Sequence, residues 1–151
     1  SGADGIDVSK TNLAIESSYL NNITDKGISV GENSTATIFN TNIAKAFVGV
    51  VAKDSSKISM SNVKLDSISF ADTMSYRKKS HFGGAEIIGI DIEPFLNKHL
   101  VQTNSYSIIN GDAIKPENID IDKLYDTVME SIKWILDKKK NTHFLQMIYQ
   151  K

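Results

Sequence analysis

The residues best suited to bind a charged ligand lie in one short stretch, residues 76–82, with the sequence YRKKSHF. It is the only place in the sequence where three or more basic residues alternate with aromatic ones. An arginine can pair a carboxylate through two parallel hydrogen bonds, and an aromatic ring offers a flat stacking face. We therefore expect this stretch to bind an acidic ligand such as a carboxylated sugar. The expected ligand-binding residues are Tyr76, Arg77, Lys79 and His81. The alternative is a solvated loop whose aromatic residues pack against the rest of the chain.

A pair of carboxylates follows in the run IDIE, where Asp91 and Glu93 alternate with isoleucines. In a strand their positions would lie about 6.6 Å apart, at about 3.3 Å per residue. That separation is near the range of the paired acids of glycosidases, so both residues are candidates for catalysis. The same alternation is typical of any half-exposed strand, which leaves an ordinary surface pair as the alternative.

The sequence supports no metal or cofactor site. His81, His99 and His143 are scattered, without the close spacing that transition-metal sites use. Asp4 and Asp7 are not followed by acidic residues at equivalent later positions, so a calcium site is not indicated. Phosphate-binding, dinucleotide-binding and nucleophile-elbow motifs are missing, and so is cysteine.

Composition narrows the class of protein. The chain of 151 residues is long enough to bury a core of its own. Its 17 basic and 18 acidic residues give a net charge of −1, which is not the profile of a dedicated nucleic-acid binder. No apolar run approaches the roughly 18 residues of a membrane span. The chain opens on SGAD without a signal-peptide pattern, and we expect it to be part of a longer polypeptide.

A repeat organises the first half of the chain. Gly5, Gly27 and Gly49 lie 22 residues apart, and Ala71 continues the series. After each glycine comes an alternating pair of apolar residues and then a polar turn. The pairs are Ile6 and Val8, Ile28 and Val30, and Val50 and Ala52. The apolar period of two indicates strands, and self-similarity at a fixed period indicates a repeat architecture.

The economical arrangement of such a repeat is a three-sided coil that stacks on the next coil at about 4.8 Å, with parallel strand pairing. We therefore predict a mainly β fold, a parallel β-helix of about five coils, right-handed by the usual crossover preference. Ile6, Ile28 and Val50 should form one inward column. The glycines should mark one tight corner, and another should contain Ser18, Asn42 and Asn62. The alternative is a β-sandwich in which the glycine spacing arises by chance.

The later coils depart from the repeat. In coil four Asp72 takes the place of an aliphatic residue and Met74 takes the second inward place, and we expect the Asp72 side chain to reach solvent or the nearby loop. The loop that follows is about 8 residues longer than its counterparts. A fifth coil is expected next, closed by a turn at Asn110 and Gly111. Its predicted inward residues are Leu100, Tyr106 and Ile108.

The C-terminal part has a helical pattern. Residues 1–114 are predicted to form the β-helix, and residues 115–151 a linker followed by an amphipathic helix from Asp122. Its apolar stripe comprises Leu124, Val128, Ile132, Ile135 and Leu136. Because an open β-helix end exposes core and strand edges, we expect this helix to cap that end. A partner-binding helix would have the same pattern.

The runs DKGISVGENS, KDSSKISMSNV and YRKKSHFGGAEI resemble the right-handed β-helix repeats of bacterial secreted and surface proteins, within the broad pectate-lyase-like superfamily. The resemblance covers residue 4 to about residue 93 and implies an extracellular or cell-surface location. It is specific for the fold and not for an activity, because this superfamily includes lyases, hydrolases, adhesins and inert spacers.

Two classes of function follow. The first is a non-catalytic module, a scaffold or carbohydrate-binding part of a larger protein. The second is a fragment of a polysaccharide lyase or glycoside hydrolase that acts on acidic glycans. The missing acidic residues on neighbouring coils favour the first class. The expected partners are an acidic polysaccharide and the remainder of a larger polypeptide; the sequence does not indicate an oligomeric state.

Overall fold

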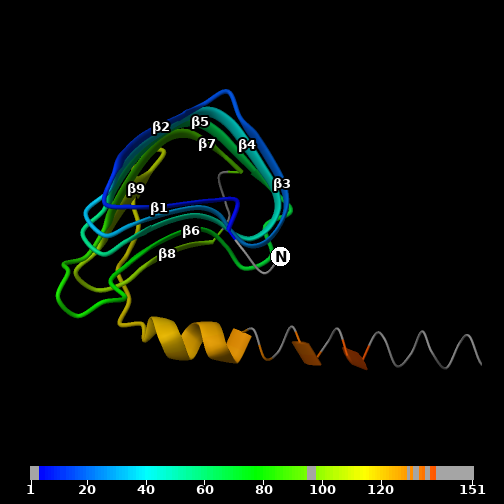
Figure 1. The fold of residues 1–151 in the computed structure, drawn as a ribbon, viewed down its shortest axis with the longest axis vertical. Helices are drawn as coiled ribbons and strands as arrows, with labels where there is room; N and C mark the ends of the chain where they lie inside the picture. The colour runs from blue at the N-terminus through cyan, green and yellow to red at the C-terminus, as the bar shows by residue number, and fades with distance from the viewer. Residues whose placement is uncertain (1–3, 95–97, 129, 131–132, 135–136, 139–151) are drawn as a thin grey trace, which may run out of the picture. The chain divides into compact units, whose positions relative to one another are not determined.

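The structure, a computed structural model, describes residues 4–94, 98–128, 130, 133–134 and 137–138. It is a mainly β, parallel β-solenoid of about four turns (Figure 1). The strands are β1 (Ile6–Ser9), β2 (Asn12–Glu16), β3 (Tyr19–Gly31), β4 (Thr35–Lys53), β5 (Lys57–Asp66), β6 (Ala71–Tyr76), β7 (Glu86–Glu93), β8 (His99–Val101), β9 (Tyr106–Ile109) and β10 (Asp112–Ala113).

The strands form three faces. The first face contains β1, the ends of β3 and β4, then β6 and β8. The second contains β2, the starts of β4 and β5, then β7 and β9. The third contains the start of β3, the middle of β4 and the ends of β5 and β7. β3 and β4 are long because each bends from one coil into the next (Figure 1).

The predicted inward column of the first face is confirmed in the first three coils. Ile6 lies beside Ile28, and Ile28 lies beside Val50, in parallel pairs. Ile28 and Val50 are fully buried. The inward residues of all three faces form one continuous apolar core, because side chains at every second position of a strand point to the same side.

Coil four is shifted by one residue relative to the prediction. Val50 pairs with Thr73 and Val51 pairs with Met74, so Thr73 occupies the inward column and Met74 lies on the outer side. Asp72 falls beside the bend at Gly49 and is 1% exposed, so of the two expected environments, solvent and the nearby loop, solvent is excluded. The cause is one extra residue in the third coil, which moves each later side chain to the opposite side of its strand.

The fifth coil is incomplete, which is why the solenoid has about four turns and not five. Leu100 pairs with Met74 on the outer side, and Tyr106 is 46% exposed, so neither is inward as predicted. Ile108 pairs with Ile88, whose neighbour Ile87 is in the core, so it also points outward. The predicted turn at Asn110 and Gly111 is present and leads into β10, which pairs antiparallel with β9.

The corners are formed by residues with left-handed backbone conformation. One corner column has φ angles of 51° at Ser17, 51° at Asn40, 50° at Asn62 and 55° at Asp91. The register places these four residues one above another. Asn62 was therefore assigned to the right corner, whereas Ser18 and Asn42 were not. Polar residues suit these positions because asparagine, aspartate and serine hydrogen-bond locally.

The glycine column forms a tight bend for a different reason. None of Gly5, Gly27 and Gly49 has a positive φ. A Cβ atom on Gly27 would lie 2.6 Å from the carbonyl oxygen of Gly49 and 2.7 Å from Cγ2 of Ile43. The bend thus requires glycine because adjacent coils and the core approach the backbone too closely for a side chain.

The chain divides into two compact units, Ser1–Asn118 and Ile119–Lys151. In the second unit residues 121–128 are helical, and the amide of Lys123 donates to Oδ1 of Asp120 at 3.1 Å, an N-cap. Leu124 and Val128 are half-buried. The other predicted stripe positions, Ile132, Ile135 and Leu136, lie outside the described residues, and the capping role stays a prediction.

Candidate functional site

The basic loop is tethered to coil three through its backbone. Oδ1 of Asp54 accepts from the amides of Lys78 at 2.7 Å and Lys79 at 2.9 Å. The amide of Gly83 donates to Oγ of Ser55 at 2.7 Å. The Asp54 side chain is 1% exposed, so the loop is anchored at a buried carboxylate. The extra loop length is therefore ordered against the solenoid.

The side chains of this loop do not converge on one ligand. Tyr76 is 2% exposed and offers no ring face, while Arg77 is exposed. The Lys79 ammonium forms an ion pair with Glu32. This contact, followed by the hydrogen bond from Ser9, holds the pKa of Glu32 below its ordinary value, and it raises the pKa of Lys79.

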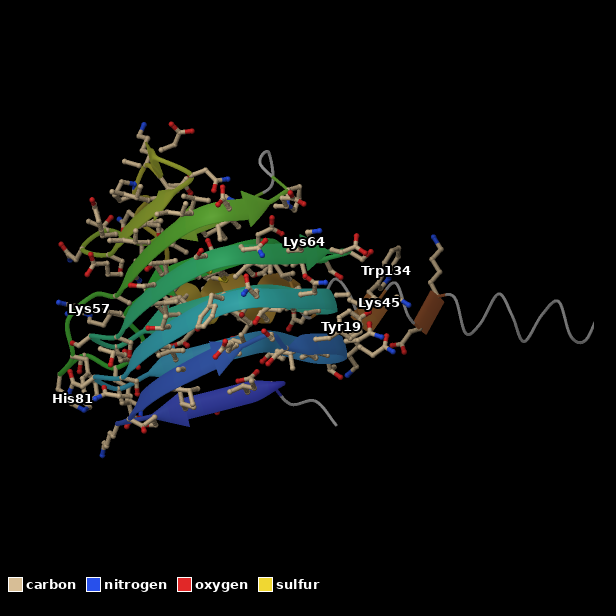
Figure 2. The ribbon with its side chains drawn as sticks, turned by 90° about the horizontal axis from the view of Figure 1, so that it is seen from above. Tyr19, Lys45, Lys57, Lys64, His81 and Trp134 are labelled. Carbon is tan, nitrogen blue, oxygen red and sulfur yellow. The ribbon has the colours of Figure 1, made fainter. Side chains whose placement is uncertain are left out.

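The His81 ring lies against the Phe82 ring with centroids 4.4 Å apart and the two planes tilted by 41°. It is exposed, and Figure 2 shows it at the same end of the strands as Lys57, far from Tyr19 and Lys64. Of the four predicted ligand-binding residues, Arg77 and His81 thus present free surface, whereas Tyr76 is buried and Lys79 is paired with an acid.

The two candidate catalytic carboxylates lie at a corner of the solenoid. Asp91 has the left-handed conformation of the corner column, and Glu93 is exposed at the end of β7. The two isoleucines that alternate with them differ, because Ile90 is 61% exposed whereas Ile92 is 1% exposed. The Asn110 side chain closes the corner, accepting from the amide of Ile92 at 2.9 Å and donating to its carbonyl at 2.8 Å.

The acids and histidines suggested by the sequence form local contacts. The Asp4 carboxylate accepts from the amide of Lys26 at 3.2 Å and lies 3.8 Å from its ammonium. Burial raises the pKa of Asp4. Nδ1 of His99 lies 2.8 Å from Oγ1 of Thr73, and burial lowers the pKa of this imidazole. His143 lies outside the described residues, which contain no group of three or more side chains able to hold a metal ion together.

A shallow groove that was not predicted from the sequence lies on the outer side of the second face. It has a volume of about 400 Å³. Its lining consists of Thr37, Ile38, Phe39, Ser59, Met60, Ser61, Ile88 and Ile90. Ile88 and Ile90 are 37% and 61% exposed. The sequence did contain a signal for this groove, because apolar residues occupy outward positions of the alternating strand pattern. The signal was overlooked because only charged residues were considered as candidates for binding.

Comparison with known proteins gives no relative. The chain matches no protein-family model, no curated protein and no solved structure among those compared. Within the part of the chain that the structure describes, no helix is long and apolar enough to cross a membrane.

Proposed function

We propose that this chain is a non-catalytic β-solenoid module that serves as a rigid scaffold within a larger protein. The observation that carries the proposal is the use of polar side chains at the corners. Two of the residues that were candidates for chemistry belong to this pattern: Lys79 forms an ion pair with Glu32 of coil two, and Asp91 lies in the corner column beside Asn62.

These contacts join coils at one repeat length. Nδ2 of Asn62 donates to Oδ1 of Asn40 at 2.8 Å. The amide of Ser34 donates to Oγ of Ser56 at 3.2 Å, and the amide of Thr11 donates to Oγ of Ser34 at 3.1 Å. Asp54 holds the basic loop in the same way. Side chains that bond from coil to coil stiffen a stack whose core is already continuous.

Asp91 tests this proposal because it lies next to Asn62 in the corner column. A carboxylate can only accept hydrogen bonds, whereas an amide at this position could donate to Oδ1 of Asn62 and extend the ladder. We expect Asp91→Asn to stabilise the protein by about 1 kcal/mol, the net value of one hydrogen bond. The matched control is Glu93→Gln, which removes the same charge outside the column and should leave stability unchanged.

The competing function is a fragment of a polysaccharide lyase or hydrolase. If the chain has this function, the parent protein should cleave a uronate polymer. Cleavage is measured through the absorbance of the unsaturated product or through the appearance of new reducing ends. Cleavage that Asp91→Asn abolishes without any gain in stability would overturn the scaffold proposal. No cleavage by the parent, together with a higher unfolding midpoint for Asp91→Asn, would support it.

A secreted or cell-surface location is part of the proposal and is supported by the resemblance of the repeat. An acidic glycan at the long loop is a second possible role, supported by the exposed Arg77 and His81.

A further inference from the structure

We propose that the edge of coil one is a docking surface for one further parallel coil of the same repeat. We define this edge as residues 6–9, 12–16 and 19–23. The partner is a coil of about 22 residues that precedes Asp4 in a longer polypeptide. The proposal concerns a different surface from the corner ladders and holds whether or not the module is catalytic.

The first observation is the pairing of the strands. Among the described residues, β1 pairs with β3 alone and β2 pairs with β4 alone. The start of β3 likewise pairs with β4 on one side. A strand inside a parallel sheet directs alternate amides and carbonyls to each neighbour, so these three segments present a row of unpaired groups on one end of the solenoid.

The second observation is the burial of the core at this end. Most inward residues of coil one are only half-buried; these are Ile6, Val8, Leu13, Leu20 and Ile23, and the exception, Ile15, is 5% exposed. Their counterparts one coil later, Ile28, Val30 and Ile43, are fully buried. Coil two has a neighbouring coil on both sides, whereas coil one has a neighbour on one side only among the described residues. One more coil would therefore bury the apolar side chains that this edge leaves half-exposed.

The glycine column defines what the partner must look like. A Cβ atom on Gly5 would lie 2.7 Å from the carbonyl oxygen of Gly27, and the same approach recurs between Gly27 and Gly49. A preceding coil must accept the carbonyl of Gly5 in the same way. The preceding coil therefore needs a glycine 22 positions before Gly5. It also needs aliphatic residues one and three positions after that glycine, as Ile6 and Val8 follow Gly5.

The opposite end of the solenoid shows why the partner is not a second copy of this chain stacked head to tail. There the edge of β9 is occupied by the antiparallel strand β10. The edge of β8 is covered by Glu117, whose amide donates to the carbonyl of Val101 at 2.8 Å and whose carbonyl accepts from Thr103 at 2.9 Å. A second copy thus offers no free parallel edge on these two faces, and the established coil-to-coil interface continues in one direction only.

The test supplies the missing coil in the same polypeptide. A copy of residues 26–47 is inserted directly before Asp4. Asp4 then follows the copy in the same register in which Val48 follows residue 47 in the chain. The control carries the same insertion with Ile28→Ser, Ile38→Ser and Ile43→Ser in the inserted copy only. Hydrogen exchange of the amides of β1 and β2, the unfolding midpoint and the oligomeric state are measured for both proteins and the parent.

We expect the inserted coil to slow hydrogen exchange at least tenfold for the amides of β1 and β2 that point away from coil two. We also expect it to raise the unfolding midpoint, and we expect the control insertion to have neither effect. Equal exchange in parent and insertion protein, or equal protection by the control, would overturn the proposal. A parent that is dimeric with these amides already protected would also overturn it, since the edge would then pair with a second copy. None of these outcomes depends on the Asp91→Asn result, so the two proposals can fail separately.

Discussion

The bend at Gly27 provides a sharp test of how closely the coils stack. Replacing Gly27 by alanine adds one Cβ atom that would lie 2.6 Å from the carbonyl oxygen of Gly49. That oxygen belongs to the backbone of the next coil and cannot turn away as a side chain can. The second obstacle, Cγ2 of Ile43 at 2.7 Å, is in the packed core. Both coils must therefore shift to admit the methyl group.

The expected cost follows from these contacts. Overpacking by a methyl group destabilises a close-packed site by about 1–3 kcal/mol. Alanine also restricts the unfolded chain, which returns about 0.4–1 kcal/mol where the native backbone suits it. The matched control is Gly31→Ala in the same strand, where the nearest atom is Cε of Lys53 at 2.9 Å, near the end of a flexible side chain. We expect Gly31→Ala to be neutral or slightly stabilising and the two variants to differ by about 2 kcal/mol.

Urea unfolding followed by circular dichroism measures this difference. With a slope of about 1–3 kcal/mol per molar urea, the two midpoints should lie roughly 1 M apart. If Gly27→Ala and Gly31→Ala unfold at the same urea concentration, the bend has room for a side chain. The close approach of successive coils described above would then be wrong.

Three further outcomes are expected. Ile28→Asp places an unpaired carboxylate at a fully buried position and should cost several kcal/mol in urea unfolding, whereas Ser59→Asp, on the exposed outer side of β5, should change little. Burial lowers the pKa of His99 from its ordinary value of 6.5, so the folded state favours the neutral ring. The contribution of neutral His99 to stability should be fully present above about pH 6.5 and should fall as the pH drops from there toward the lowered pKa of the folded state. His99→Gln should reduce this pH dependence. A pH profile that the substitution leaves unchanged would contradict the burial of this ring. Titration of a uronate oligosaccharide should show weaker binding by an Arg77→Ala/Lys79→Ala variant than by the parent if the loop binds acidic glycans. Equal binding by both proteins, or by neither, would remove the loop as a site.

The register of the first face could be predicted for coils one to three because two independent patterns give it, the glycine spacing and the aliphatic pairs. Coil four lacks both signals. Two frames are possible there, and the structure selects the one that turns Thr73 and Ser75 inward and Met74 outward. Hydropathy favours the opposite frame, in which Met74 would point inward. A hydropathy pattern does not contain the hydrogen bond between Thr73 and His99 that accompanies the observed frame. The error then carried into coil five, where Leu100 was placed inward.

The candidate site was predictable in composition and not in geometry. The basic character of the long loop was visible in the sequence, whereas the inclusion of Tyr76 in β6, where it pairs with Lys53 of β4 and is 2% exposed, was not. The ion pair between Lys79 and Glu32 joins residues 47 positions apart, a separation that no local pattern reveals. Asp91 appeared to lie on a regular strand, since the alternation around it resembles one. Its corner role follows only from its position beside Asn62.

The central claim is the parallel stacking of coils at one repeat length, and methyl NOE spectroscopy tests it most directly. In a protein labelled at isoleucine, leucine, valine and methionine methyl groups, the account predicts strong NOEs within three pairs that are 22 residues apart. These pairs are Ile28 and Val50, Ile38 and Met60, and Ile43 and Leu65. Missing NOEs in all three pairs, with contacts instead between strands adjacent in sequence as in a hairpin meander, would contradict it.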